Sequence, residues 1–482
     1  MAPHEQPDGL TQQGITGLTP DRVTAILARI ADPERRLAVH QQLFPDLLNL
    51  GTAENVLLYP RLKENVFDEL PGIGEHDIRY PVPIYGTQQL RTDIAELLRP
   101  LFDSDLRKED VFGTSGVSAA LECLAFALKH GEVLETGDRV LLPAPFWPGF
   151  KWCFEQRPGL VCVAAPLTSK GSENFELTLE DLQRAYHAEK EPPKLLVLTN
   201  PNNPLGVNYP KDLLEKIYDW ALKETQMHII SDEMYAHSQI RTSELPFVSA
   251  LSLDAYRNDP AARERVHVTW GFAKDFGLSG FKAGVVISRS SVVQDVLTEK
   301  SGEPYSWFSP FDSLKHYVLG KLLETRKDGG SFALELMAEY RETLTDAFQS
   351  ARAAFDRNKI KYVFHKGQNP AQFFWLDLRQ YLKHEVPEIP WERGPHFPQN
   401  GNGEPAKPGD LRLPVLFSEI NSAEEDLRKY IAENAHVQLL PGQAMSNVEP
   451  GYFRLCYTAF DKETVREAID RIGQALASRG QR

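Results

Sequence analysis

The 482-residue chain lacks any run of apolar residues long enough to cross a membrane, and acidic residues outnumber basic ones. A membrane-spanning helix needs roughly 18 or more consecutive, largely apolar residues, and none is present. Lys and Arg total 53 against 67 Asp and Glu, a net charge of −14, which argues against the clustered basic surface of a nucleic-acid-binding protein. The first residues, MAPHEQPDGLTQQGITGLTP, lack the basic start and apolar core of a signal peptide. We therefore expect a cytoplasmic protein that binds neither membranes nor nucleic acid.

Cysteines and metal-binding motifs are equally sparse. Four cysteines occur in apolar surroundings without a CxxC pair, which is typical of reduced core residues in a cytosolic protein. They are Cys123, Cys153, Cys162 and Cys456. Thirteen histidines show no HxxxH or HExxH spacing, so we expect no metal site.

The order of apolar and amphipathic segments predicts a three-layer α/β fold. Between about residues 85 and 290, short apolar runs alternate with amphipathic helical stretches such as 117–130 and 211–225. Predicted strands cover 140–142, 195–199, 228–231, 267–270 and 284–288. This alternation is typical of a mostly parallel sheet covered by helices on both faces.

The rest of the chain predicts a smaller α+β domain. Predicted helices cover 311–326, 332–358 and 462–477, and predicted strands cover 362–364 and 373–376. Residues 385–410 contain six Pro and four Gly and are expected to form an inserted surface loop. We divide the chain into a large domain, 85–325, a small domain, 326–482, and an N-terminal segment, 1–84. That segment, with a helix predicted from Thr19, should contribute to the small domain and to dimer contacts.

Several blocks that suit one flat, anionic ligand follow the predicted strands, at the edge where α/β sheets bind ligands. Gly116, Val117 and Ser118 start a helix whose free N–H groups favour a phosphate, although a plain glycine cap would give the same pattern. Trp147, in PAPFWPGFKW, is either a core side chain or a flat face for a heteroaromatic ring. Asn203, in TNPNNPLG, is an amide donor on a rigid turn.

Two more strand ends carry ionisable groups. Asp232, in ISDEMY, ends an apolar strand, where a carboxylate is costly unless it is paired, and a protonated ring nitrogen would pair with it. Tyr235, three residues on, is placed to donate to a ring oxygen. Lys274 lies in a glycine-flanked loop after a strand. A solvated lysine would fit that loop, but so would a lysine that binds a carbonyl cofactor covalently.

Together these blocks resemble the class I and II aminotransferase family, the aspartate aminotransferase superfamily of fold type I. Within it, six blocks are similar to the branch of 1-aminocyclopropane-1-carboxylate (ACC) synthases. They are NLGTAENVLLYPRL, PFWPGF, TNPNNPLG, ISDEMY, AKDFGLSGF and EPGYFRLCYT, and they are collinear between about residues 45 and 475. The resemblance implies a homodimeric enzyme that uses pyridoxal 5′-phosphate (PLP), with sites at the subunit interface and a small amino acid or amino-acid-like substrate.

The resemblance also implies roles for residues around the cofactor ring. Lys274 would bind PLP covalently and later move the Cα proton of the substrate. Asp232 would keep the pyridine nitrogen protonated. Asn203 and Tyr235 would bond the ring hydroxyl, and Trp147 would stack on the ring in place of the family's tyrosine.

At the two ends of the site, the implied residues bind phosphate and substrate. Gly116, Val117 and Ser118 would hold the phosphate. Arg454 would pair with the substrate α-carboxylate through its planar fork. Glu54 and Asn203 would also face the substrate.

The chain departs from the family pattern at the phosphate. The family's Ser-x-Ser-Lys, with Arg eight residues later, is replaced here by Gly271, Phe272, Ala273 and Lys274, with Lys282 at the arginine position. Two hydroxyl donors are therefore absent. Where members of the branch have Tyr-His-Gly, residues 84–86 are Ile-Tyr-Gly, so Tyr85, which would reach the partner's site, is one position out of register.

The motifs leave the reaction open. The branch resemblance favours elimination, cyclisation or replacement at an activated or sulfur-bearing side chain, whereas the broader family and the shifted tyrosine favour transamination. A PLP-sensing transcription regulator would need a basic DNA-binding domain before the family core, where only about 45 residues stand. Retention of Lys274, Asp232 and Arg454 argues against a non-catalytic relative.

Overall fold

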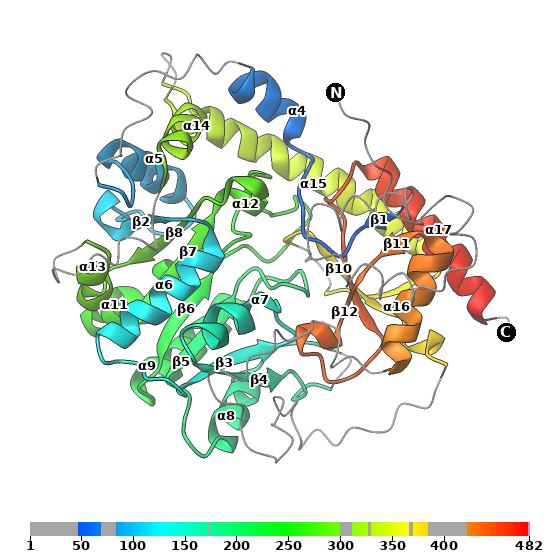
Figure 1. Ribbon diagram of the computed structural model, residues 1–482, viewed down its shortest axis with the longest axis horizontal. Coiled ribbons are helices and arrows are strands. Elements are labelled where there is room, and N and C mark those ends of the chain that lie inside the picture. The colour runs from blue at the N-terminus through cyan, green and yellow to red at the C-terminus, as the bar shows by residue number, and fades with distance from the viewer. Residues whose placement is uncertain are drawn as a thin grey trace, which may run out of the picture.

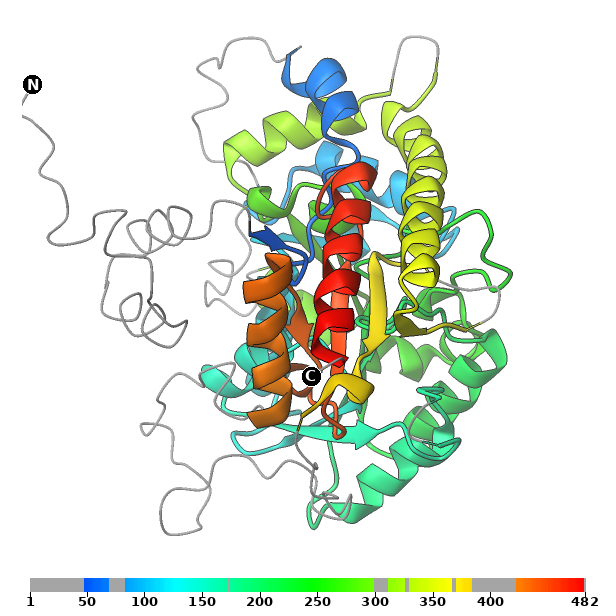
Figure 2. The ribbon, with the colours of Figure 1, turned by 90° about the vertical axis from the view of Figure 1, so that its right-hand side faces the viewer.

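In the computed structural model, Figures 1 and 2 show two bodies of sheet and helix side by side. The structure describes residues 47–68, 83–171, 174–298, 311–325, 329–365, 370–383 and 422–480. The predicted helix at Thr19 and the predicted loop at 385–410 lie outside these residues.

A seven-stranded sheet in the order β2-β8-β7-β6-β5-β3-β4 forms the larger body. Its strands are β2 Val111–Thr114, β3 Arg139–Ala144, β4 Val161–Pro166, β5 Leu195–Thr199, β6 His228–Asp232, β7 Val266–Gly271 and β8 Gly284–Ser288. Strands β3 to β7 pair in parallel, and β8 runs antiparallel to both β7 and β2. Every residue of β5, β6, β7 and β8 is buried, which explains why these strands read as continuous apolar runs. The expected α/β fold is confirmed.

Helices pack along this sheet where the hydrophobic pattern places them. Helix α6 (Val117–His130) lies against β7 and β8, and α8 (Leu179–Ala188) lies against β3 and β4. The bounds of α6, β5 and β8 are those predicted. Helix α9 (Lys211–Lys223) ends slightly before the predicted residue 225.

The prediction for helix α14 was wrong at its C-terminal end. The helix covers Ser313–Leu323 and does not continue to residue 326. Its chain leaves the helix because Thr325 forms a β-bridge with Ser331. Ser331 in turn caps α15 (Phe332–Arg357), because its side chain accepts a hydrogen bond from the Leu334 N–H.

A four-stranded antiparallel sheet in the order β12-β13-β10-β9 forms the smaller body. Its strands are β9 Lys361–Val363, β10 Phe373–Asp377, β12 Leu440–Pro441 and β13 Tyr452–Cys456. Helices α15, α16 (Ser422–Ala435) and α17 (Lys462–Gly480) pack together beside it (Figure 2). Strand β1 (Leu48–Asn49) pairs in parallel with β11 (Val437–Gln438), so the start of the described chain joins this C-terminal part.

The structure can be compared with what the sequence indicated about membrane helices, metal sites and cysteines. No helix of the described residues is long and apolar enough to cross a membrane. No group of three or more His, Cys, Asp or Glu side chains in the described ranges is placed to hold a metal ion. All four cysteines are buried and free, and burial raises the pKa of Cys123 and of Cys153 to about 12.

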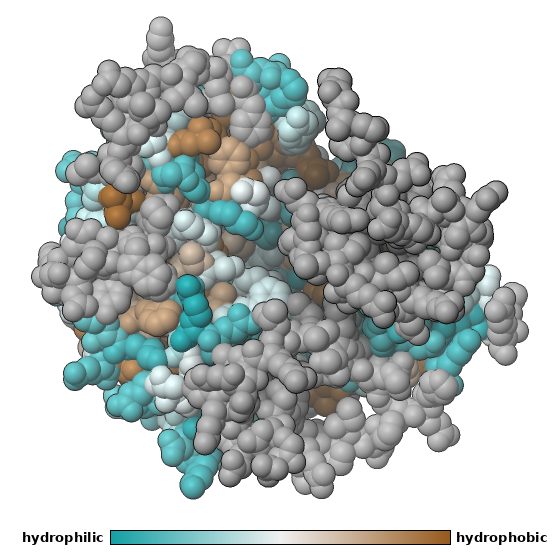
Figure 3. Space-filling model, viewed as in Figure 1, coloured by the Kyte–Doolittle hydropathy of each residue, from teal (hydrophilic) through white to brown (hydrophobic). Residues whose placement is uncertain are grey.

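Apolar side chains are exposed where α4 (Tyr59–Leu62), α14 and α15 come together. They are Tyr59 on α4, Leu314 on α14 and Leu334 on α15. Figure 3 shows apolar surface gathered over this part of the molecule. This surface is used below in the proposal for the assembly.

Candidate active site

The carboxyl ends of β5, β6 and β7 bring three predicted residues to one edge of the sheet. Asn203 lies on the turn after β5, Asp232 ends β6, and Lys274 follows β7. The chain segments are bonded to one another there, because Asn200 N donates to the Asp232 carbonyl at 3.0 Å and Glu233 N donates to the Thr269 carbonyl at 2.9 Å. Parallel neighbours thus place an amide, a carboxyl and an amine at the same edge of the sheet.

Asp232 is a buried carboxyl without a cationic partner among the described residues. Burial raises its pKa to about 7, and hydrogen bonds from the Met234 N–H and from Thr269, whose Oγ1 lies 3.5 Å from Asp232 Oδ1, oppose that rise. A positive group next to Asp232 would stabilise the ionised carboxylate. This environment fits the protonated nitrogen of a pyridine ring.

Lys274 lies on α12 (Phe272–Asp275), the short turn that follows β7. Its Nζ donates a hydrogen bond to the main-chain carbonyl of Ala53. Burial lowers the pKa of the Lys274 amine; Glu54 opposes this effect, and Arg454 strengthens it. A larger fraction of uncharged amine is therefore present near neutral pH, as a nucleophile or base requires.

Arg454 on β13 is a buried guanidinium whose donors are only partly used. Its Nη1 donates to Asn203 Oδ1 and its Nη2 donates to the Gly51 carbonyl, both at 2.7 Å. Its Cζ lies 4.6 Å from the centre of the Phe373 ring. The Nε atom is buried and has no hydrogen-bond partner in the described part of the chain. A carboxylate is the group that such a fork fits.

Tyr235 and Asn203 complete the buried polar groups at this edge. The Tyr235 ring contacts Phe373 edge-on, with ring centres 5.3 Å apart. Burial raises the pKa of the Tyr235 hydroxyl well above its usual value, against the opposing effect of Arg454. The hydroxyl therefore stays protonated and is available as a donor.

The N-terminus of α6 forms a donor site in which glycines allow the backbones to approach closely. No side chain caps this helix, and its N-cap residue, Gly116, has a φ of 87°, a value that side chains disfavour. A Cβ on Gly116 would lie 3.6 Å from the Cα of Lys282, which places that lysine beside the helix end. Free N–H groups and a cation together fit a phosphate, and Ser118 lies on the first turn.

The same packing explains the glycine that replaces one family serine. A Cβ on Gly271 would lie 2.8 Å from the Ala283 carbonyl oxygen and 3.1 Å from Val117 Cγ2. Atoms do not approach so closely without a shift of the backbone. A serine at position 271 would therefore require the surrounding backbone to shift.

Two predicted residues have no described contact with the others. Trp147 is half-buried and meets Phe150 edge-on, with ring centres 5.5 Å apart. The guanidinium of Arg91 lies 4.9 Å from the Tyr85 ring centre, and the Tyr85 carbonyl accepts from Gly113 N at 2.7 Å. Stacking by Trp147 and a reach of Tyr85 into a partner's site stay predictions.

Sequence reasoning missed residues that hold the main chain of Lys274. The Lys274 carbonyl accepts hydrogen bonds from the side-chain amides of Asn55 and Gln372, both at 2.9 Å. Asn55 could have been found from the sequence, because it follows Glu54 in a block that the resemblance already marks. Asp275 could have been noticed as well, because it directly follows Lys274. Gln372 lies in no recognisable block, so only the fold could reveal it.

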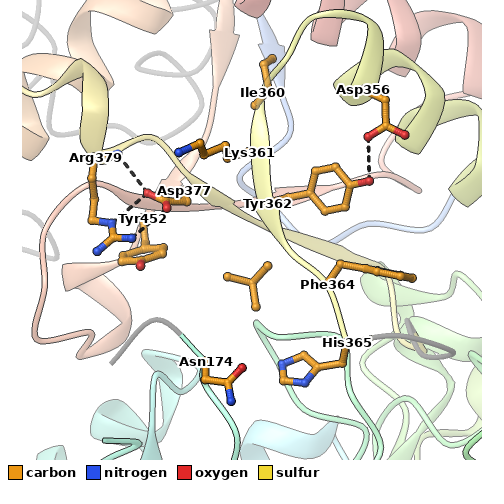
Figure 4. Close-up of a pocket in the computed structure, with 11 residues that line it drawn as sticks. Asn174, Asp356, Ile360, Lys361, Tyr362, Phe364, His365, Asp377, Arg379 and Tyr452 are labelled. Atoms are coloured by element: carbon orange, nitrogen blue, oxygen red, sulfur yellow. Dashed lines mark hydrogen bonds and ion pairs between the residues drawn. The ribbon is translucent and has the colours of Figure 1, made fainter. Parts of the chain in front are cut away.

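A cavity of about 450 Å³ lies elsewhere, next to β9 and the ends of β10 and β13 (Figure 4). Figure 4 shows Asn174 and His365 next to each other at its lower edge, with Arg379 at the left. None of the predicted site residues lines this cavity. Arg379, which lines the cavity, is paired with Asp377 at 2.9 Å and with Glu449 at 2.7 Å.

The sequence matches the family Aminotransferase class I and II over residues 46–472. It is 27% identical over 442 residues to 1-aminocyclopropane-1-carboxylate synthase 3 of Oryza sativa subsp. japonica, which covers 89% of this chain and 86% of the rice protein. It is 26% identical over 447 residues to 1-aminocyclopropane-1-carboxylate synthase 4 of Arabidopsis thaliana, with 90% and 80% of the two chains covered.

Solved structures share the fold at lower identity. A double mutant of Thermus thermophilus aspartate aminotransferase superposes with a TM-score of 0.65 and 21% identity, covering 97% of this chain and 100% of the other. The aromatic aminotransferase from Pyrococcus horikoshii gives a TM-score of 0.64 and 20% identity, covering 92% and 99%. Fold type I is thereby confirmed, and the chain belongs to the class I and II aminotransferase family and is a PLP-dependent enzyme.

Proposed function

We propose that this enzyme removes the Cα proton of an α-amino acid and then eliminates, cyclises or replaces an activated or sulfur-bearing side chain. The observation that carries the first part is that Arg454 and Lys274 lie close enough for their charges to interact. The Nε atom of Arg454 has no hydrogen-bond partner among the described residues, and the Lys274 amine has a lowered pKa. One group fits the α-carboxylate and the other fits the adjacent Cα proton. The similarity to ACC synthases supports the second part.

The residues at the sheet edge would divide the work as follows. Bound PLP supplies a protonated pyridine ring that withdraws electrons from Cα. Asp232 stabilises that protonation, and Asn203 and Tyr235 donate to the ring hydroxyl. The Nζ atom of Lys274 would hold the cofactor covalently until the substrate amine displaces it, and the freed amine, whose pKa burial lowers, would then take the Cα proton. Glu54, whose charge opposes the lowering of the Lys274 pKa, would face the substrate.

The phosphate would sit at the N-terminus of α6. Gly116, Val117 and Ser118 offer the helix end, and Lys282 offers positive charge without the fork of an arginine. We assign this cofactor-binding part to a large domain, 85–325, and the substrate arginine to a small domain, 326–482. Residues 1–84 would serve the small domain and dimer contacts.

We further propose a cytoplasmic homodimer. The exposed apolar side chains of Tyr59, Leu314 and Leu334 support a contact surface near α4, α14 and α15. Tyr85 and Trp147 would complete the site, Tyr85 from the partner chain and Trp147 against the cofactor ring. Within its own chain, the Tyr85 ring lies 4.9 Å from the Arg91 guanidinium.

Transamination is the second candidate. The family includes aminotransferases, and Tyr85 stands one position away from the place of the branch tyrosine. A transaminase would return the proton to the cofactor side and would need a 2-oxo acid to complete its cycle. The two candidates share every residue named above and differ in the fate of the substrate side chain.

A substrate screen separates them. The purified enzyme is incubated with S-adenosylmethionine, cysteine conjugates and common amino acids, each with and without a 2-oxo acid. Elimination predicts product from a single substrate without an acceptor, together with release of a thiol, a thioether or a similar group. Strict dependence on a 2-oxo acid, with the cofactor accumulating in its amine form, would instead establish transamination.

The assignment of Lys274 has its own test. Borohydride reduction followed by peptide mapping should place PLP on Lys274 in the wild type, and Lys274→Ala should lose both the covalent label and the visible absorption band. Lys282→Ala serves as the matched control, because this exposed lysine should alter affinity without removing the label. Covalent PLP in Lys274→Ala would show that another lysine holds the cofactor.

A further inference from the structure

The turn that carries Lys274 is held through its main chain by residues from three parts of the fold. Helix α12 is only four residues long, so its carbonyl groups lack intrahelical partners. The Lys274 carbonyl accepts from Asn55 of the N-terminal segment and from Gln372, which precedes β10, both at 2.9 Å. On the other side of the same peptide group, Asp275 is completely buried.

Asp275 receives donors on both carboxyl oxygens. Ser238 Oγ donates to Oδ1 at 2.7 Å, while Trp270 Nε1 and the His237 N–H donate to Oδ2 at 2.9 and 3.1 Å. A proton on the carboxyl group would displace one of these donors. Burial raises the pKa of Asp275 to about 7, and these donors oppose that rise, so the donor set favours the ionised carboxylate and holds it in one orientation.

Gln372 closes a ring of hydrogen bonds that returns to Lys274. One N–H of its Nε2 bonds the Lys274 carbonyl, and the other bonds the Tyr340 hydroxyl at 2.9 Å. The Tyr340 hydroxyl lies 3.2 Å from Ser238 Oγ. Because the Ser238 proton is directed to Asp275, Tyr340 must donate to Ser238. The ring thus runs in one direction, from Gln372 through Tyr340 and Ser238 to Asp275 and back along the chain to Lys274.

The ring joins the small sheet to the large one. Tyr340 lies on α15 and Gln372 stands beside β10, whereas Ser238 and Asp275 follow strands β6 and β7. Gln372 and Lys274 are 98 residues apart in sequence, and Ser238 and Tyr340 are 102 apart. A rotation of the peptide group after Lys274 would break bonds on both sides, so the direction of the lysine side chain depends on these distant residues.

We propose that Gln372, acting with Tyr340, is a positioning residue that directs the Lys274 amine toward the reacting Cα. The inference rests on the proposed role of Lys274. Among the described residues, the Gln372 side chain bonds the Lys274 carbonyl and the Tyr340 hydroxyl, and it therefore acts on the amine through that carbonyl. Through Gln372, the position of α15 and of the small sheet affects the direction of that amine.

The side-chain oxygen of Gln372 gives a way to tell a positioning role from a merely structural one. Its Oε1 is buried and has no hydrogen-bond partner in the described ranges, and such an acceptor costs stability. Gln372→Leu removes this unsatisfied acceptor together with the two donors. We therefore expect little change in melting temperature but a changed environment of Lys274.

Three variants test the inference in the holoenzyme and in the apoenzyme. Gln372→Leu should lower kcat about ten-fold and Tyr340→Phe about three-fold, each with KM nearly unchanged, from the loss of ordinary hydrogen bonds. Both should shift the pH at which the visible band of bound PLP changes. In the apoenzyme, both should alter the rate at which Lys274 is reductively methylated, measured by mass spectrometry. Tyr457→Phe is the matched control, since its buried hydroxyl bonds the Ala371 carbonyl at 3.0 Å, outside the ring.

The outcomes are distinguishable. Variants whose kcat, spectral pH dependence and Lys274 methylation equal those of Tyr457→Phe would overturn the inference. So would losses that merely follow a fall in melting temperature. If Gln372→Leu does not fold, the result for Tyr340→Phe decides alone. This variant removes one hydroxyl from the hydrogen-bonded ring and keeps the aromatic side chain that packs there. Borohydride labelling of the wild type at a lysine other than Lys274 would refute the proposed function itself.

Discussion

Replacing Arg454 by alanine removes the guanidinium that we assign to the substrate α-carboxylate. The side chain is 3% exposed, and two of its N–H groups are already bonded at 2.7 Å, to Asn203 and to the Gly51 carbonyl. The donors that remain, including the unpartnered Nε, are those a carboxylate would use. Truncating one member of a buried, charged, hydrogen-bonded pair costs about 2–5 kcal/mol. The expected loss in kcat/KM is therefore about 30-fold to about 4,000-fold.

The assay compares an α-amino acid substrate with the amine that lacks its carboxylate. Spectral titration of bound PLP measures binding of both compounds to wild type and to Arg454→Ala, and kinetics measure turnover of the amino acid. The loss should appear with the amino acid and be nearly absent with the amine, because only the amino acid carries the partner of Arg454. Arg454→Lys should fall between wild type and Arg454→Ala, because lysine keeps the charge and loses the fork.

A matched control lies next to the same sheet. Arg379 is also partly buried and ion-paired, but it lines the separate cavity of Figure 4. Arg379→Ala should leave kcat/KM unchanged, even if its loss lowers the melting temperature. An equal loss of binding for amine and amino acid in Arg454→Ala, or no loss for either, would refute the assignment.

Other predictions concern the phosphate site and the core. Lys282→Arg should tighten PLP binding to the apoenzyme by up to roughly 1–2 kcal/mol, measured by titration, because a fork replaces a single charge; weaker binding would show that the native site has repacked around the lysine. Gly271→Ser should destabilise the protein by about 1–3 kcal/mol in urea unfolding, because its Cβ meets the backbone, whereas Ala273→Ser should be tolerated. The buried rings of His228 and His267 lie with nitrogens 3.2 Å apart, and burial lowers the pKa of His228 to about 4. Between pH ~6.5 and about 4, His228 binds a proton in the unfolded chain but not in the folded protein. The free energy of unfolding should therefore fall by up to about 3 kcal/mol as the pH falls through this range. The difference in unfolding free energy between wild type and His228→Gln should show that slope, and parallel pH profiles would contradict it.

Much of the fold was predictable because burial leaves a clear sequence pattern. Strands β5 and β8 are buried along their whole length, so their apolar runs end where the strands end. Helix α6 begins after a glycine with positive φ, a position that its sequence marks. Helix α14 was predicted too long because its last turn is replaced by a bridge between Thr325 and Ser331, a pairing that no local pattern indicates.

The site was predictable where a block carries its own chemistry. Asp232 and Lys274 stand at strand ends, and the topology brings such ends together. Arg454 comes from a different sheet, and its bond to Asn203 depends on how the two sheets meet. Gln372 is an ordinary glutamine in sequence, and only its distance to the Lys274 carbonyl reveals a role. Long-range hydrogen bonds of this kind leave no periodicity to detect.

The three glycines behind the proposed phosphate site also constrain how this sequence can change. Gly271 faces the Ala283 carbonyl and Gly284, while a Cβ on Gly284 would lie 2.7 Å from the carbonyl carbon of Gly116. Gly271 and Gly284 are therefore small because neighbouring backbone is packed against them, whereas Gly116 adopts a positive φ that disfavours a side chain. Regaining the missing serine by one substitution would carry the cost given above, since its Cβ would meet the Ala283 carbonyl and Val117 at the start of the helix. Engineering the family's full donor set into this enzyme would require coordinated replacement of the segment around Gly284, not a point mutation.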